Sequence, residues 1–150
     1  MGKDKYENED LIKYGLPIDV WFHVDNISSA HVYLRLPEDV SINEIPKDAL
    51  NECLQLVKEN SIEGCKKDRV SIVYTPWQNL LKRPSAEIGE VGFKKQNEVI
   101  TVHNISEDRQ VLKRINKTKE VKEVNFETEK EAYVKEMANK KKKFFDETVN

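Results

Sequence analysis

Cysteine is scarce in this chain of 150 residues: it occurs only at Cys53 and Cys65, without CxxC spacing or a nearby histidine cluster. This pattern indicates neither a zinc site nor a redox-active pair. Cys53 falls at an apolar position of an expected helix, and free cysteine is among the residues most often buried. Two unpaired thiols favour a reducing, cytoplasmic location.

Long apolar runs are also missing. No stretch approaches the roughly 20 residues of a membrane-spanning helix, and we expect no signal peptide. The sequence has no glycine-rich phosphate loop, no GxSxG elbow and no HExxH pair. Because no catalytic or metal-binding constellation is visible, we expect neither an enzyme nor a bound cofactor or metal.

Charge is abundant but nearly balanced. Charged residues make up 35% of the chain, and the formal net charge is −2. Acidic residues outnumber basic ones in residues 1–103, and basic residues outnumber acidic ones in the remainder. The field of the whole domain would repel phosphate, so any nucleic-acid binding must come from local patches.

The most distinctive stretch is residues 19–36, DVWFHVDNISSAHVYLRL. It predicts two short strands joined by a polar turn at residues 25–29. His23 and His31 lie in these strands with Trp21 and Tyr33, so one surface would combine stacking faces with titratable nitrogens. A hydrogen-bonded histidine pair is the stronger interpretation. A metal site is the weaker one, because metal sites usually supply three or four clustered ligands.

The rest of the chain alternates helical and extended patterns. We expect a helix at residues 7–15, a second one with an apolar stripe at 46–61, and a strand at 69–75. A basic, irregular loop is expected at 77–84, followed by a second hairpin formed by 90–95 and 99–102 around residues 96–97. After residue 107 the apolar residues are too scattered to define a stripe, but 126–145 favours a helix.

This order predicts an α+β domain over residues 1–105, with a mostly antiparallel sheet and helices on one face. The opposite face can then stay open. Residues 106–150 would form a charged helical tail that protrudes or packs on another copy of the chain. We interpret the lysines at 140–143 as a solvated face, with a phosphate or membrane-surface contact as the alternative.

Support for nucleic-acid binding is distributed over aromatic and basic residues. Exposed aromatics on a sheet can stack with unpaired bases, and nearby cations can hold the backbone. The candidates for stacking are Trp21, Tyr33 and Tyr74. The other candidates for contact are His23, His31, Arg35, Lys3, Lys5, Lys66, Lys67, Arg69, Lys82, Arg83, Lys94 and Lys95. The competing interpretation is that the aromatics form the core and the lysines keep the surface solvated.

Several of these residues occur in motifs that resemble the NFACT-R domain family. The matching pieces are GKD at residues 2–4, ENExL at 7–11, DxWFH at 19–23, HV at 31–32, VYT at 73–75 and GxVxF at 89–93. The segments YENEDLIKYG, WFHVD and SSAHVYLRL resemble those of a short subfamily, whose members continue into a charged helix. The resemblance covers about residues 2–102 and implies an RNA-binding domain known from ribosome quality-control proteins.

The leading hypothesis is a non-catalytic nucleic-acid-binding domain. RNA is the first candidate ligand, either transfer RNA or ribosomal RNA in ribosome-associated quality control, with DNA as another possibility. The alternative is a protein-interaction module that acts through the sheet or self-associates through the C-terminal helix. A third interpretation is DNA binding at a membrane surface through the tail lysines.

Overall fold

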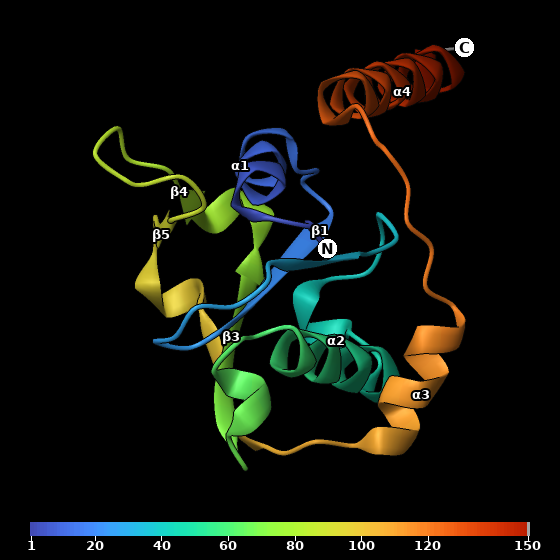
Figure 1. Ribbon diagram of the computed structural model, residues 1–150. Coiled ribbons are helices and arrows are strands. Elements are labelled where there is room, and N and C mark those ends of the chain that lie inside the picture. Colours follow the sequence, from blue (N-terminus) through green and yellow to red (C-terminus); the bar gives the residue numbers. More distant parts are fainter. Residues whose placement is uncertain (150) are drawn as a thin grey trace.

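A four-stranded antiparallel sheet forms the centre of the computed structural model, which describes residues 1–149 and their side chains through Lys141 (Figure 1). Its strand order is β2-β1-β3-β6. These strands are β1 (Asp19–Val24), β2 (Val32–Arg35), β3 (Val70–Pro76) and β6 (Ile100–Ile105). A separate two-stranded sheet pairs β4 (Leu80–Leu81) with β5 (Gly92–Phe93).

Helices and short 3-10 turns connect the strands. The helices are α1 (Lys5–Tyr14), α2 (Lys47–Glu59), α3 (Arg109–Lys117) and α4 (Phe126–Val149). The 3-10 turns are η1 (Ile42–Glu44), η2 (Gly64–Lys66), η3 (Trp77–Asn79) and η4 (Gln96–Glu98). The fold is therefore α+β with a mostly antiparallel sheet and a charged C-terminal helix, as the sequence predicts.

Helix α2 covers one face of the sheet. Its apolar stripe, which includes Cys53 and Val57, packs on alternate residues of β1 and β3 such as Phe22 and Ile72. Phe22, Val57 and Ile72 are each 0% exposed. Burying a side chain of this size contributes roughly 1.5–3 kcal/mol. The buried free thiol of Cys53 confirms the expectation for that residue.

The opposite face of the sheet is not open. Trp21 and Val73 lie on it, only 2% and 8% exposed, and they cluster with Leu80 of β4. Phe93 of β5 packs against the same cluster. The prediction of an irregular loop at residues 77–84 was wrong, because this segment contains η3 and β4. Two-residue strands leave too short an alternating pattern to be recognised in a sequence.

The second hairpin expected around residues 96–97 was also wrong. β5 pairs with β4, whereas β6 pairs with β3, so the two segments belong to different sheets. Residues 96–98 form η4 instead of a hairpin turn. The physical reason is that β3 offers β6 a longer ladder, and the hydroxyl of Thr75 donates to the carbonyl of Glu98 at 2.9 Å to hold the crossing chain.

Residues after the last strand form a short helix that the scattered apolar pattern did not indicate. Helix α3 buries Val111 and Leu112 and packs against α2. Its first turn is capped by Asp108, whose carboxylate accepts from the backbone N–H groups of Gln110 and Val111. The buried side chain of Gln55 also joins α2 to this segment. Two adjacent buried residues suffice here because α2 provides the partner surface.

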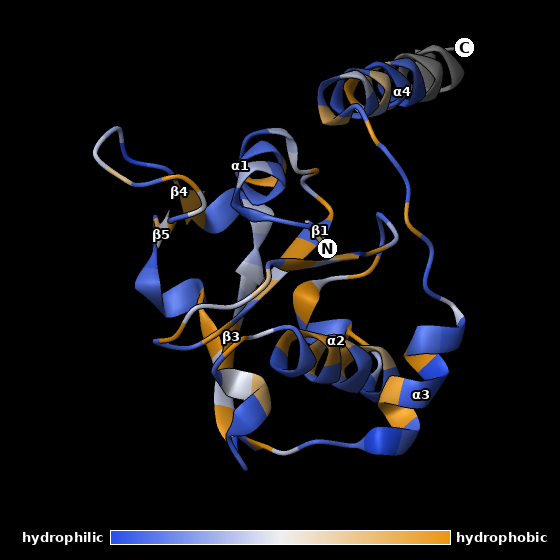
Figure 2. Cartoon of the chain, in the orientation of Figure 1, coloured by the Kyte–Doolittle hydropathy of each residue, from blue (hydrophilic) through white to orange (hydrophobic). Residues whose placement is uncertain are grey.

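Helix α4 is hydrophilic along most of its described length and contacts α1 (Figure 2). Lys130 donates to the carbonyl of Gly15 at 2.6 Å, and its ammonium lies 4.1 Å from the ring centroid of Trp77. Lys140 forms an ion pair with Glu38 at 3.0 Å. Of the lysines at 140–143, those at 142 and 143 lie outside the described side chains.

Candidate nucleic-acid interface

A cluster of rings forms between the first hairpin and β5. Because Trp21 pairs with Tyr33 in the β1–β2 ladder, the chain just before β2 brings His31 beside the indole. The indole N–H of Trp21 donates to Nδ1 of His31 at 3.0 Å. The ring of His23 stacks on Trp21 with centroids 5.3 Å apart, and Phe93 meets Trp21 edge-on.

Burial lowers the pKa of both histidines of this cluster, and the geometry fixes the neutral form of His31. The bond from Trp21 requires an unprotonated Nδ1 on His31, so the neutral ring carries its proton on Nε2. Burial lowers the pKa of His31 to about 4, with a further contribution from the neighbouring His23. Burial also lowers the pKa of His23. Because His31 is only 3% exposed, its ring lies in the interior.

The expected stacking aromatics are mostly interior as well. Trp21 is 2% exposed and Tyr74 is 7% exposed, so both contribute to the core rather than to a platform. Tyr33 is half-buried, and its hydroxyl is buried without a hydrogen-bond partner among the described residues. Burial raises the pKa of the Tyr33 phenol. Phe93 was not among the predicted stacking residues, and its only signal in the sequence was its place as the last residue of the GxVxF motif.

Arg35 is an exposed cation whose guanidinium already has two carboxylate partners. It contacts the buried carboxylate of Asp19, with Nε 2.9 Å from Oδ1, and the carboxylate of Glu129 from α4. Asp19 is 1% exposed and also accepts from the backbone N–H of Leu16 at 2.9 Å. Arg35 therefore links the edge of the sheet to the C-terminal helix.

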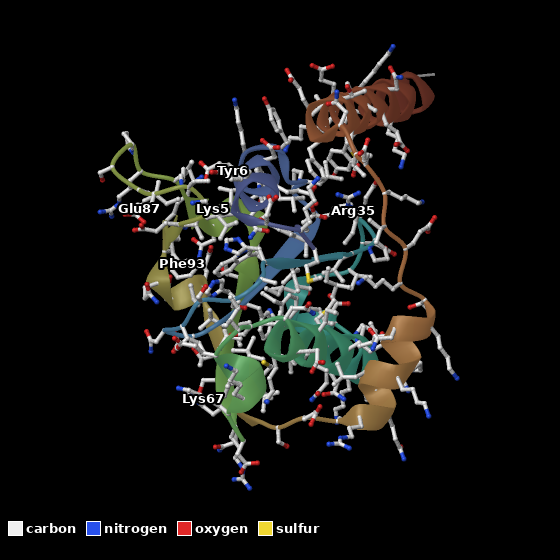
Figure 3. All side chains as sticks on the ribbon, viewed as in Figure 1. Lys5, Tyr6, Arg35, Lys67, Glu87 and Phe93 are labelled. Carbon is white, nitrogen blue, oxygen red and sulfur yellow. The ribbon has the colours of Figure 1, made fainter. Side chains whose placement is uncertain are left out.

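Lys82 is also committed to internal contacts. Its ammonium lies 2.8 Å from the carboxylate of Glu9 on α1 and donates to the carbonyls of Glu87 and Glu90. Glu9 accepts in addition from the backbone N–H of Gly89 at 2.8 Å. This arrangement ties the loop between β4 and β5 to α1, and Figure 3 places Glu87 in that loop.

The remaining basic candidates are exposed and fall into three groups. Lys3 and Lys5 lie at the start of α1. Lys5 is close to Gly89 of the loop between β4 and β5, and Arg83 belongs to that loop. Lys66, Lys67 and Arg69 lie at η2 and the start of β3. Lys94 and Lys95 follow β5. Figure 3 shows Lys67 well apart from Lys5, so the structure does not join all the candidates into one patch.

The group at η2 lies beside the turn of the first hairpin. Lys67 and Arg69 line a pocket of about 260 Å³ together with Asn26 of that turn. Behind them, the ammonium of Lys58 is buried and donates to the carbonyls of Gly64 and Lys67. Its positive charge adds to the potential at this end of the domain.

Lys94 and Lys95 are held by a residue that the sequence analysis did not single out, Asn79. The Asn79 side chain donates to the carbonyl of Lys95 and accepts from its N–H, both at 2.9 Å. The N–H of Lys94 donates to the carbonyl of Asn79 at 2.9 Å. Nothing in the sequence marks Asn79, because its role depends on two segments that meet only in the fold.

The described part of the chain offers neither a cluster of metal ligands nor a membrane-spanning helix. Among the side chains of residues 1–141, no three or more of histidine, cysteine, aspartate or glutamate gather in the arrangement of a metal site. None of the helices described there combines the length and apolar character needed to cross a bilayer. Chemically, the site offers solvated cations, amides and a few apolar surfaces.

Comparison with known proteins places these features in a family. The model described as the NFACT protein RNA binding domain matches residues 1–95. Coiled-coil domain-containing protein 25 of Danio rerio is 53% identical over 93% of this chain and 67% of its own length. Its Dictyostelium discoideum homologue is 54% identical over 88% of this chain and 64% of its own length. Protein JLP2 of Saccharomyces cerevisiae is 43% identical over 79% of this chain and 59% of its own length.

A solved structure shares the fold. The C-terminal part of the fibronectin/fibrinogen-binding protein from Streptococcus suis matches with a TM-score of 0.59 and 19% identity. The match covers 75% of this chain and 42% of that one. The chain thus spans about two thirds of the length of the first curated relatives and less than half of this structural neighbour. By its motifs, its fold and the match over residues 1–95, the chain belongs to the NFACT-R family of RNA-binding domains.

Proposed function

We propose that this chain is a non-catalytic RNA-binding domain that holds transfer RNA or ribosomal RNA in the cytoplasm, as part of ribosome-associated quality control. The observation that carries this function is the family match over residues 1–95, which spans the basic candidates from Lys3 to Lys95. The model that matches is described as an RNA-binding domain.

The exposed cations are suited to phosphate contacts. Lys67, Arg69, Lys94 and Lys95 have no ion-pair partner among the side chains through residue 141, unlike Arg35 and Lys82. A solvated lysine or arginine can exchange its water and counterions for phosphate at little structural cost. These four residues also line surface pockets, so we assign phosphate binding first to them.

Binding can be measured by fluorescence anisotropy with a labelled transfer RNA, single-stranded DNA and double-stranded DNA over a salt series. We expect transfer RNA to bind at low salt and to dissociate as salt rises, because bound phosphates release counterions. Lys67→Glu with Arg69→Glu, and Lys94→Glu with Lys95→Glu, should each weaken binding. Reversal of Lys47 and Lys113, two exposed lysines on helices, is the matched control.

The outcomes separate the possibilities. Absence of transfer-RNA binding by the wild-type chain at low salt would refute the function. Equal affinity for DNA and RNA would contradict the preference for RNA and indicate a general nucleic-acid-binding domain. Co-sedimentation of the chain with ribosomal subunits, lost in the same charge-reversal variants, would support the quality-control role. A chain that never co-sediments with ribosomes would contradict that role.

Self-association through α4 is a second candidate function. Val134 of this helix is 54% exposed and is followed by the charged residues Lys135 and Glu136. Sedimentation velocity over a range of protein concentrations would compare the full chain with a chain that ends before α4. A concentration-dependent increase in mass that requires α4 supports self-association. A monomer at every concentration contradicts it.

A further inference from the structure

A pocket of about 630 Å³ lies where the end of β3, η1 and the connection from β5 to β6 meet. Its volume is within the roughly 300–1,000 Å³ of small-molecule sites. The lining combines apolar surface with carboxamide side chains. The apolar residues are Ile42, Pro76 and Ile100, and the carboxamide residues at the pocket surface include Asn43, Gln78 and Asn97.

The wall that carries Asn97 is fixed by internal hydrogen bonds. Asn79 is 3% exposed and bonds to both backbone groups of Lys95, while its side-chain N–H also donates to the hydroxyl of Thr75 at 3.0 Å. The hydroxyl of Thr75 donates in turn to the carbonyl of Glu98. The segment from Lys94 to Glu98 is thus anchored to the end of β3, and a preformed wall lowers the ordering cost of binding.

Two cations complete the pocket. Lys94 and Lys95 belong to its lining, and both are exposed. Neither forms an ion pair within the described side chains. They provide a place for a phosphate beside a surface made of amides and aliphatic groups.

We infer that this pocket holds one unpaired nucleobase of the bound RNA, with Lys94 and Lys95 on the adjoining phosphate. This inference rests on the proposed RNA-binding function and names the part of RNA that the domain reads. A carboxamide offers a donor and an acceptor side by side, which matches the edge of a base. The aliphatic groups of Ile42, Pro76 and Ile100 can contact the face of the ring.

The base must be unpaired for this geometry. In an A-form duplex every base is stacked and paired, and only its minor-groove edge is readily accessible, so a pocket cannot surround the base. A base in a loop, a bulge or a single strand can leave the stack and enter. The ligand is therefore single-stranded RNA or an RNA loop.

Glu98 gives the pocket a preference among bases. It is the acidic residue of the lining, and an ionised carboxylate only accepts hydrogen bonds. Cytosine presents an amino group on its edge, whereas uracil presents a carbonyl at the equivalent place. We therefore expect oligo(C) to bind more tightly than oligo(U), and Glu98→Gln to reduce that difference.

The test compares the affinities of the full chain for oligo(C), oligo(U) and a blunt-ended RNA duplex of the same length. The variant Asn97→Ala with Gln78→Ala should lose about tenfold in affinity for oligo(C), since two hydrogen bonds of ordinary net strength are removed. Its affinity for the duplex should not change. Gln96→Ala is the matched control, because Gln96 lies in the same 3-10 turn but outside the pocket lining.

Ultraviolet crosslinking of oligo(C), followed by mass spectrometry, localises the contact independently of affinity. We expect the crosslink in the segment from Lys94 to Ile100. Equal binding of the duplex and oligo(C), with no difference between the double variant Asn97→Ala, Gln78→Ala and the control Gln96→Ala, would overturn the pocket while leaving salt-dependent transfer-RNA binding intact. Absence of any RNA binding by the wild-type chain would overturn the pocket and the proposed function together.

Discussion

His31 and Asp19 are polar residues of the first hairpin that stabilise the interior of the domain. His31 is 3% exposed and accepts a hydrogen bond from Trp21, and Asp19 is 1% exposed and accepts from Arg35 and Leu16. Their partners explain why a histidine and an aspartate are tolerated inside, since a buried polar group without partners would be costly. The stability of the domain should therefore depend on both.

Acid should destabilise the domain through His31. The pKa of His31 is lowered to about 4 by burial, from an ordinary value of 6.5. Between these pH values the unfolded chain binds the proton that the folded chain excludes, so the free energy of unfolding falls as pH decreases through this window. The lost free energy of unfolding reaches up to about 3 kcal/mol, because a shift of one pKa unit corresponds to about 1.36 kcal/mol.

Urea denaturation at a series of pH values checks this expectation. His31→Gln should be less stable than the wild type at neutral pH, and its stability should vary less between pH 6.5 and pH 4. The difference between the two curves isolates His31 from the carboxylates that titrate in the same range. Parallel curves for the two proteins would contradict the buried, neutral state of this ring.

Loss of the Asp19 carboxylate should destabilise the hairpin. Asp19→Ala removes the acceptor of the Leu16 N–H and the buried partner of Arg35. We expect a cost of about 2 kcal/mol, because a buried N–H loses its partner while the exposed side of Arg35 stays solvated. Asp39→Ala, at an exposed aspartate, is the control in the same denaturation experiment. Equal stability of the two variants would argue against the role of Asp19.

At the scale of elements, a few side-chain contacts hold the loop between β4 and β5 and helix α4 against the rest of the domain. Glu9 on α1 holds the loop between β4 and β5 through Lys82 and Gly89. Lys130 on α4 contacts Gly15 and Trp77 near the end of α1 and the start of η3. Because these contacts are few and partly solvated, each element should open more readily than the sheet.

Glu9→Gln should release the loop at residues 82–90. The amide keeps the size of the side chain but loses the charge that attracts Lys82. Hydrogen exchange measured by mass spectrometry should show faster exchange of this loop, while β1 and β3 remain protected. Glu87→Gln, in the exposed part of the same loop, should leave exchange unchanged. Unchanged exchange in both variants would mean that Glu9 does not hold the loop.

Lys130→Ala should weaken the docking of α4 on α1. The lost cation–π contact with Trp77 is worth about 0.5–1 kcal/mol at a partly exposed site. We expect a change in tryptophan fluorescence and faster hydrogen exchange in α4. Lys135→Ala, at an exposed position of the same helix, is the comparison. Identical spectra for both variants would exclude the contact between Lys130 and Trp77.

The long elements could be predicted from their patterns. The aromatic and β-branched residues of 19–24 and the helical stripe through Cys53 and Val57 each depend on one segment, and both predictions are confirmed. β4 and α3 were missed because two residues, or two adjacent apolar residues, carry no period. The pairing of β5 and β6 was wrong because a strand chooses its partner through the whole sheet, not through its nearest turn.

The candidate site was predictable to a smaller extent. Exposure of lysines in turns follows from composition, and Lys67, Lys94 and Lys95 are exposed. The ion pairs of Arg35 with Asp19 and of Lys82 with Glu9 could not be predicted, because the partners lie far apart in the sequence. The anchor residue Asn79 and the pocket that it supports likewise join segments that are separate in the chain.

At the scale of the whole molecule, the chain is a small sheet domain with separate exposed cationic groups and a net charge of −2. Such a surface attracts RNA only locally, since the overall field is slightly repulsive to phosphate. We therefore expect a limited number of phosphate contacts and a moderate dependence of the affinity on salt, rather than the steep dependence of a strongly basic protein.

The most direct test of RNA binding by this domain is the salt dependence of its affinity for a single-stranded RNA, measured for the wild type and for Lys94→Gln with Lys95→Gln. The account predicts that the wild-type affinity falls linearly on a log–log plot. Because Lys94 and Lys95 share one phosphate, their replacement should reduce the slope by about 0.7, the value per phosphate on a single strand. A wild-type affinity independent of salt, or equal slopes for the two proteins, would contradict it.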